Sequence, residues 1–213
     1  MNDTSTEPVK RHFIDPAPRF RDQRNLLPAV FLDRDGVINE EVHYLSRIED
    51  LKLIPGSARA IARLNDAGIP VIVVTNQSGV ARSYLTEDHL CDIHQEMIVM
   101  LAREHAALQG IYYCPFHKDG DGEYRRESPY RKPKPGMLLA AAAEFAISLT
   151  DSVMVGDRIN DLRAGHAAGT RTIMVRTGHG VKEAALPDAT KADVIVDDLA
   201  AAVDYIFTSV IGR

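Results

Sequence analysis

The stretch Phe31-Leu32-Asp33-Arg34-Asp35-Gly36-Val37 places two carboxylates directly after a short apolar run, Ala29–Leu32. Continuous rather than alternating hydrophobicity in such a run is typical of a parallel strand that is covered on both faces. In open α/β sheets, binding sites form just outside the carboxyl ends of the strands. Asp33 and Asp35 therefore stand where a site is expected, although Asp and Gly also commonly end a strand in an ordinary turn.

Five further short apolar runs are typical of buried strands, and segments with helical spacing separate them. The runs are Pro70–Val74, Ile111–Cys114, Ser152–Val155, Thr172–Val175 and Asp193–Val196. The alternation of strand and helix predicts a three-layer, Rossmann-like α/β fold with a doubly wound, mostly parallel sheet. We expect one domain over residues 28–213, preceded by an N-terminal extension of residues 1–27.

The composition of the 213-residue chain limits its partners and location. The formal net charge is -5 and 45% of the residues are hydrophobic, so neither nucleic acid nor an anionic membrane is an expected partner. Cys91 and Cys114 give no disulfide framework. No apolar run reaches the roughly 18 residues of a membrane span. We therefore expect a cytoplasmic protein without a secretory signal, present as a monomer or a small homo-oligomer.

A second pair of acids follows the predicted strand Ser152–Val155. Asp157 comes just after this strand and Asp161 lies four residues later, where an acidic residue also favours the start of a helix. If the two strands are neighbours, Asp33 and Asp157 meet at one edge of the sheet. Hard oxygen ligands with no His or Cys nearby favour Mg²⁺, which bridges readily to phosphate.

Two further motifs supply groups that suit phosphate. Thr75-Asn76-Gln77-Ser78-Gly79 ends a predicted strand and offers a hydroxyl and an amide, and Arg131-Lys132-Pro133-Lys134-Pro135-Gly136 is basic. Lys binds phosphate as a point charge, and Arg can bind it in a bidentate manner. Taken singly, the first motif could be a strand-ending turn and the second a solvated basic loop.

The order of the four motifs resembles that of the haloacid dehalogenase (HAD) superfamily of phosphotransferases, over about residues 28–178. The sequences at 31–39, 75–82, 131–137 and 155–161 are similar to those of the D-glycero-D-manno-heptose 1,7-bisphosphate phosphatases, to which the histidinol-phosphate phosphatases are close relatives. The resemblance implies a magnesium-dependent phosphomonoester hydrolase that acts on a small phosphorylated sugar, and in particular a heptose bisphosphate 7-phosphatase of carbohydrate metabolism.

By this resemblance, Asp33 is the nucleophile that forms an aspartyl-phosphate, and Asp35 is the general acid and base. Mg²⁺ is expected on the side chains of Asp33 and Asp157 and on the backbone carbonyl of Asp35. Asp161 is expected to support these ligands from behind.

The resemblance also implies the residues that hold the substrate. Thr75 and Lys132 complete the catalytic set by binding the phosphoryl oxygens. The implied substrate-binding residues are Glu41, Val42, His43, Tyr44, Thr75, Asn76, Gln77, Ser78, Arg131 and Lys132. The intervals between motifs are filled by predicted core elements, so we expect no large cap domain and an open pocket.

The chain departs from the heptose family in the long loop 115–135, which in that family usually binds zinc through Cys-x-His and Cys-x-Cys. Cys114 remains, but Phe116 stands at the His position, with His117 one place late. Ser128 and Tyr130 replace the second pair. One thiolate does not make a four-ligand zinc site, so we expect no zinc. The other histidines show no shared ligand spacing, and we expect most of them at the surface.

Three alternatives stay open. The first is a phosphatase for histidinol phosphate or another small ester. The second is a signalling receiver domain, in which the acidic pair and the acceptor Asp lie on different strands, whereas both acids here follow the first strand. The third is a non-catalytic binding module, against which the full set of catalytic residue types argues.

Overall fold

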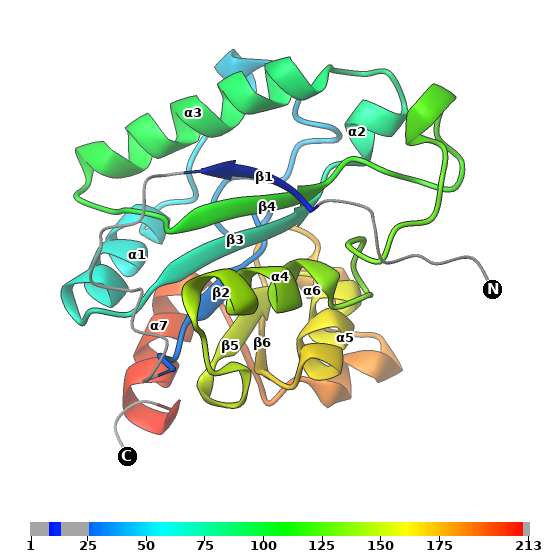
Figure 1. The fold of residues 1–213 in the computed structure, drawn as a ribbon. Helices are drawn as coiled ribbons and strands as arrows, with labels where there is room; N and C mark the ends of the chain where they lie inside the picture. Colours follow the sequence, from blue (N-terminus) through cyan, green and yellow to red (C-terminus); the bar gives the residue numbers. More distant parts are fainter. Residues whose placement is uncertain (1–8, 14–25, 211–213) are drawn as a thin grey trace.

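A computed structural model describes residues 9–13 and 26–210 (Figure 1). Its seven-stranded sheet has the strand order β1-β4-β3-β2-β5-β6-β7. Only β1 runs antiparallel to its neighbour, and all other pairs are parallel. The strands are β1 Lys10–Phe13, β2 Val30–Leu32, β3 Val71–Asn76, β4 Gly110–Cys114, β5 Val153–Gly156, β6 Arg171–Val175 and β7 Val194–Val196.

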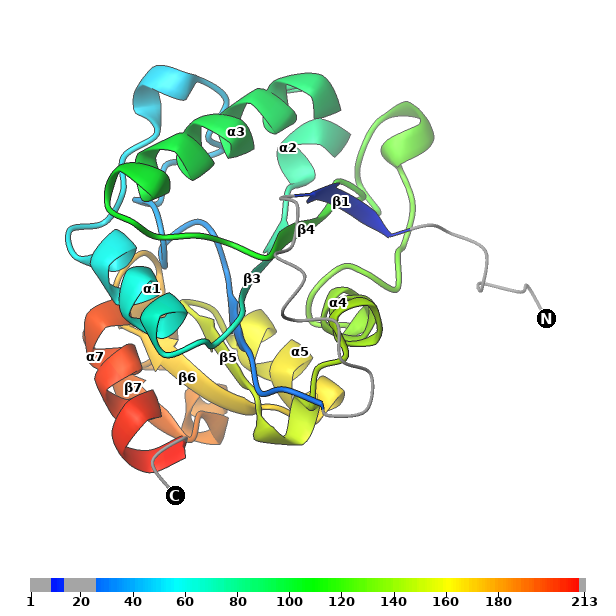
Figure 2. The same ribbon diagram turned by 60° about the vertical axis from the view of Figure 1, so that its left-hand side comes forward.

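Helices cover both faces of the sheet, as Figure 2 shows, with α1, α3 and α7 on one side and α4 and α5 on the other. These helices are α1 Ser57–Asp66, α3 Glu87–Arg103, α4 Gly136–Phe145, α5 Ile159–Ala168 and α7 Leu199–Tyr205. Short helices α2 Ser78–Ala81 and α6 Gly180–Glu183 follow β3 and β6. Single 3-10 or π-helical turns occupy Ile48–Asp50, Gly122–Tyr124, Leu149–Asp151, Pro187–Lys191 and Ile206–Val210.

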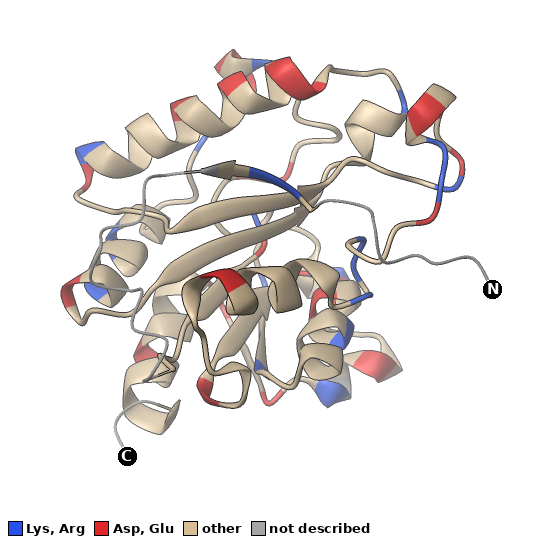
Figure 3. Ribbon diagram, in the orientation of Figure 1, with Lys and Arg blue, Asp and Glu red and all other residues tan. Residues whose placement is uncertain are grey.

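The central strands are apolar because both of their faces are buried. Val30 and Leu32 of β2 pack under α1 and α3, whereas Phe31 packs under α4. Figure 3 colours the charged residues, which lie mainly on the outer helices, on the loops and on the edge strand β1, whereas β2, β3 and β4 carry none. The predicted doubly wound, three-layer α/β fold is confirmed. In the described part of the chain, no helix has the length and apolar character needed to cross a membrane.

The sheet register brings the motifs together. Leu32 of β2 pairs with Val73 of β3 on one side and with Val155 of β5 on the other. The chain segments that follow these three strands therefore leave the sheet at the same edge, as the rule for open α/β sheets requires.

The N-terminal region adds a strand that the apolar runs did not predict. Lys10–Phe13 pairs antiparallel with β4, with Arg11 opposite Tyr112 and His12 opposite Ile111. This strand lies within the predicted extension 1–27, most of which falls outside the described residues. Its four residues KRHF lack the apolar run that marked the other strands.

Candidate active site

Three carboxylates meet at the carboxyl edge of the sheet. Asp33 follows β2, Asp157 follows β5, and Asp161 lies in the first turn of α5. One oxygen from each lies within 4.8 Å of the other two, and all three residues are buried. The predicted meeting of Asp33 and Asp157 is confirmed, because β2 and β5 are neighbours.

This acidic cluster fits a hard divalent cation. Asp157 Oδ2 accepts a hydrogen bond of 2.7 Å from the backbone N–H of His179. Its buried Oδ1 has no hydrogen-bond partner among the residues that the structure describes. Burial, with the charges of Asp161 and Asp33, raises the pKa of Asp157 to about 8. Such a set of crowded carboxylate oxygens, one of them unpartnered, matches the donor chemistry of Mg²⁺.

Two glycines make room for the Asp157 carboxylate. A Cβ atom at either Gly36 or Gly178 would overlap Asp157. Both glycines also have positive φ angles, 78° and 57°, which residues with a side chain adopt only with strain. The chain therefore needs glycine at these two positions to close around the acidic cluster.

Lys132 lies between the acids. Its Nζ is 2.9 Å from Asp33 Oδ1 and 2.6 Å from Asp161 Oδ1, and its side chain is 2% exposed. Burial alone would lower the pKa of Lys132, but Asp161 and Asp33 raise it above its ordinary value. Burial raises the pKa of Asp33 to about 6, against the opposing effect of Lys132.

Asn76 fixes the backbone of Lys132. The Asn76 amide donates to the Lys132 carbonyl oxygen and accepts from the Lys132 N–H, both at 3.0 Å. The predicted substrate-binding Asn76 thus holds the loop that carries the lysine, through a pair of bonds that imitates a strand ladder.

Asp35 is held by several donors. Arg34 donates to both of its carboxylate oxygens at 2.8 Å, Asn39 donates to Oδ1, and Gln77 donates to Oδ2, both at 2.9 Å. Burial works against ionisation, but Arg34 and the other donors leave the pKa of Asp35 below its ordinary value. Arg34 and Asn39 were not predicted as site residues, although both lie in the stretch 31–39 on which the resemblance rests. Gln77 also donates to Thr75 Oγ1 at 2.9 Å.

A cavity of about 460 Å³ opens above these groups. It is lined by every predicted site residue except Asp157, which is fully buried behind the others. It is also lined by seven residues that were not predicted as site residues, namely Leu45, Gly79, Arg82, His117, Arg158, Asn160 and His179. Arg82 and Arg158 could have been found, because they fall inside the matched motifs 75–82 and 155–161.

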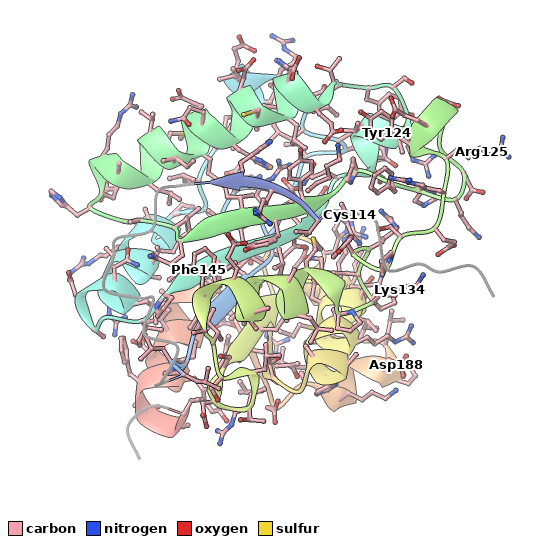
Figure 4. All side chains as sticks on the ribbon, viewed as in Figure 1. Cys114, Tyr124, Arg125, Lys134, Phe145 and Asp188 are labelled. Carbon is pink, nitrogen blue, oxygen red and sulfur yellow. The ribbon has the colours of Figure 1, made fainter. Side chains whose placement is uncertain are left out.

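The loop between β4 and α4 is ordered by aromatic packing. Phe116 is buried, its ring stacks on Tyr124 with centroids 5.9 Å apart, and the guanidinium of Arg126 lies 3.9 Å from the Phe116 centroid. The Tyr124 hydroxyl donates to Glu87 Oε1 of α3 at 2.9 Å. Figure 4 labels Tyr124 on this loop, beyond Cys114 at the end of β4. Phe116, which the resemblance places at the position of a zinc-binding histidine, thus packs in the interior of the loop.

Two family models of HAD-like hydrolases match the chain. The model for haloacid dehalogenase-like hydrolases matches residues 30–99, and the model for HAD-hydrolase-like proteins matches residues 129–202. With the sheet order and the acidic cluster at the carboxyl ends of its strands, these matches define a HAD-like hydrolase.

Individual proteins similar to this chain indicate which family of HAD-like hydrolases it belongs to. The chain is 45% identical over 193 residues to a D-glycero-D-manno-heptose-1,7-bisphosphate 7-phosphatase of Thermosynechococcus vestitus, covering 87% of this chain and 98% of the relative. It is 45% identical over 154 residues to the corresponding β-anomer enzyme of Haemophilus influenzae, covering 72% and 84%. The crystal structure of a B. bronchiseptica D,D-heptose 1,7-bisphosphate phosphatase with magnesium and phosphate aligns with a TM-score of 0.75 and 33% identity, covering 85% and 98%. The chain belongs to the family of heptose-bisphosphate 7-phosphatases.

Proposed function

We propose that this protein hydrolyses the 7-phosphate of D-glycero-D-manno-heptose 1,7-bisphosphate in a magnesium-dependent reaction that proceeds through an aspartyl-phosphate on Asp33. One observation carries the proposal: Asp33 stands at the carboxyl end of β2 with Lys132 on one oxygen and Asp157 and Asp161 within 4.8 Å. Two relatives that are 45% identical in sequence are named as heptose-1,7-bisphosphate 7-phosphatases, which supports the choice of sugar.

Asp33 is oriented for attack by two donors to a single oxygen. The backbone N–H of Arg34 donates to Oδ1 at 2.7 Å, and Lys132 Nζ lies 2.9 Å from the same atom. Both contacts limit rotation of the carboxylate. A carboxylate nucleophile converts one difficult displacement at phosphorus into two easier ones.

The metal would be held by the side chains of Asp33 and Asp157 and by the backbone carbonyl of Asp35. When bound, Mg²⁺ supplies positive charge that offsets repulsion between these carboxylates and the phosphate. Lys132 and Thr75 bind the phosphoryl oxygens, and Asp161 holds the Lys132 ammonium in place at 2.6 Å.

Asp35 serves first as acid and then as base. Its donors favour the carboxylate, which is the form that deprotonates the hydrolytic water in the second step. In the first step a phosphate dianion enters next to Asp35. A neighbouring negative charge raises a carboxyl pKa, so substrate binding favours the protonated form that can donate to the leaving sugar oxygen.

Arg82, His117 and Arg131 in the lining of the cavity suit a second phosphate. Burial and the nearby charge of Arg82 both lower the pKa of Arg131, and burial together with Arg131 and Arg82 lowers the pKa of His117. Arg82 also has a buried Nε without a hydrogen-bond partner in the described part of the chain. An anion bound by Arg82 and Arg131 relieves the repulsion between the two arginines, which favours a bisphosphate over a monophosphate.

We also propose that the enzyme needs no zinc, because packing of Phe116, Tyr124 and Arg126 orders the loop. Elemental analysis of the purified protein tests this point. One stoichiometric zinc per chain would contradict it.

The substrate is tested by magnesium-dependent phosphate release from heptose 1,7-bisphosphate, from the 1-monophosphate and 7-monophosphate, and from histidinol phosphate. We expect the highest kcat/KM for the bisphosphate, and loss of activity in Asp33→Asn. A higher kcat/KM for histidinol phosphate would overturn the choice of sugar but leave the phosphatase chemistry in place.

A further inference from the structure

A series of buried and half-buried polar contacts runs from Asp35 to the N-terminal strand β1. Arg34 has no exposed surface, and its Nη2 donates to both Asp35 oxygens. Its other terminal nitrogen, Nη1, lies 3.0 Å from Nε2 of His94 on α3. His94 Nδ1 in turn lies 2.8 Å from Nδ1 of His12 on β1.

Arg34 determines which ring nitrogen of His94 carries the proton. A guanidinium can only donate hydrogen bonds, so His94 Nε2 must accept. The proton of a neutral His94 is then on Nδ1, which donates to His12 Nδ1. His94 is 1% exposed, and burial together with the charge of Arg34 lowers its pKa well below the ordinary value. A neutral His94 is therefore the form that fits.

The strand β1 brings His12 to this position. Alternation along the strand directs Arg11 to the other face, where it pairs with Glu144 at 3.4 Å. Lys10 anchors the strand to α3 through an ion pair of 3.0 Å with Glu87. The His12 ring also packs on Tyr113 of β4, with centroids 4.6 Å apart. The contact between His12 and His94 is thus supported from both neighbouring elements.

We propose that His94, held by His12 of the N-terminal strand, is a positioning residue that fixes the guanidinium of Arg34 and through it the carboxylate of Asp35. The inference rests on the acid and base role proposed for Asp35. It gives the N-terminal strand a part in the reaction, since His12 is linked through His94 and Arg34 to the carboxylate of Asp35, which transfers the proton.

The physical reason is the cost of a buried guanidinium that lacks an acceptor. Without His94, Nη1 of Arg34 loses its hydrogen bond in a site closed to solvent. Arg34 then gains by moving toward another acceptor or toward water, and the bidentate contact with Asp35 changes. Proton transfer in the transition state depends on that geometry.

A leaving-group comparison tests the positioning role. The parameter kcat/KM reports the steps up to release of the leaving group, before the hydrolytic water is used. A sugar alkoxide needs a proton from Asp35, whereas p-nitrophenolate leaves without one. We expect His94→Leu to lower kcat/KM for heptose 1,7-bisphosphate by about 30-fold, and that for p-nitrophenyl phosphate by less than about threefold.

Two further variants and two controls complete the test. The amide of His94→Gln can accept from Arg34 and donate to His12, so it should restore most of the sugar-phosphate activity. His12→Phe keeps His94 in place and should lower the sugar-phosphate value by about fivefold, which preserves the comparison if His94→Leu fails to fold. Gln95→Ala, at an exposed position on the same helix, and Arg11→Ala, on the opposite face of β1, should leave both values unchanged.

Equal losses on both esters, or no loss in any His94 or His12 variant, would overturn the inference. If the wild-type enzyme releases phosphate and Asp33→Asn does not, such a result leaves the proposed function standing. If the wild-type enzyme hydrolyses neither ester, or Asp33→Asn remains active, the proposed function fails first.

Discussion

The ammonium of Lys132 lies 2.9 Å from the Asp33 carboxylate in a position where both side chains are almost fully buried. In this site the lysine offsets part of the negative charge gathered by Asp33, Asp157 and Asp161. Replacing it removes the cation but leaves the buried acids. We expect Lys132→Met to lower the metal-free free energy of unfolding by about 3 kcal/mol and to abolish measurable turnover.

Denaturant unfolding with and without Mg²⁺ measures the loss of stability in Lys132→Met. Because the metal replaces part of the missing charge, Mg²⁺ should recover more stability in Lys132→Met than in the wild-type protein. Lys134→Met is the matched control, since Lys134 lies half-exposed in the same loop and forms an ion pair with Glu127 at 3.2 Å. Unfolding free energies that agree between Lys132→Met and the control would contradict this account.

Magnesium should stabilise the folded protein even without substrate. A ligand present at 100 times its Kd stabilises the native state by about 2.7 kcal/mol. We expect thermal unfolding to shift upward when Mg²⁺ replaces EDTA, and the shift to be lost in Asp157→Asn, which removes one carboxyl group from the acidic cluster. An equal shift in the wild-type protein and in Asp157→Asn would place the metal elsewhere.

Glu41 should make stability fall as the pH rises. Burial and the charge of Asp35 raise the pKa of Glu41 from 4.5 to about 7. Between these values the folded state binds the proton that the unfolded state has lost, so the stabilising contribution decreases as pH rises through 7. The gain in melting temperature of Glu41→Gln over the wild-type protein should therefore grow from pH 5 to pH 8. A constant difference would show that Glu41 titrates normally.

The aromatic packing in the loop should support substrate binding. Arg131 Nη1 donates to the Phe116 carbonyl oxygen at 3.2 Å, so the packed loop around Phe116 also positions this arginine. We expect Phe116→Ala to cost about 3 kcal/mol of stability and to raise KM for the bisphosphate more than it lowers kcat. Tyr124→Phe, which removes only the hydroxyl bond to Glu87, should cost about 1 kcal/mol. A KM unchanged in Phe116→Ala would show that the packing around Phe116 does not support substrate binding.

Much of the fold and the acidic site could be predicted because they depend on local patterns. Each central strand is an uninterrupted apolar run, and Asp33 and Asp157 follow two of those runs directly. Once parallel neighbours are assumed, the carboxyl ends of the strands bring these side chains together without further information.

The remaining parts depend on contacts between residues distant in sequence. The strand Lys10–Phe13 is polar, and pairing with β4 rather than its own hydrophobicity places it in the sheet. His94 is one of several histidines without ligand spacing, and its burial became evident only from its contacts with Arg34 and His12. It is an exception to the expectation that most histidines lie at the surface. Gln77 likewise stands in a motif typical of phosphate contacts, yet its amide holds Asp35 and Thr75.

The central claim is that Asp33 carries the phosphoryl group, and chemical trapping tests it most directly. The enzyme is mixed with heptose 1,7-bisphosphate and Mg²⁺, quenched in acid within the first turnover, and treated with borohydride, which reduces an acyl phosphate to an alcohol. Peptide mass spectrometry should then find homoserine at position 33, and only when both substrate and Mg²⁺ are present. Homoserine at position 35 or 157, or phosphate release at full rate with an unmodified Asp33, would contradict the account.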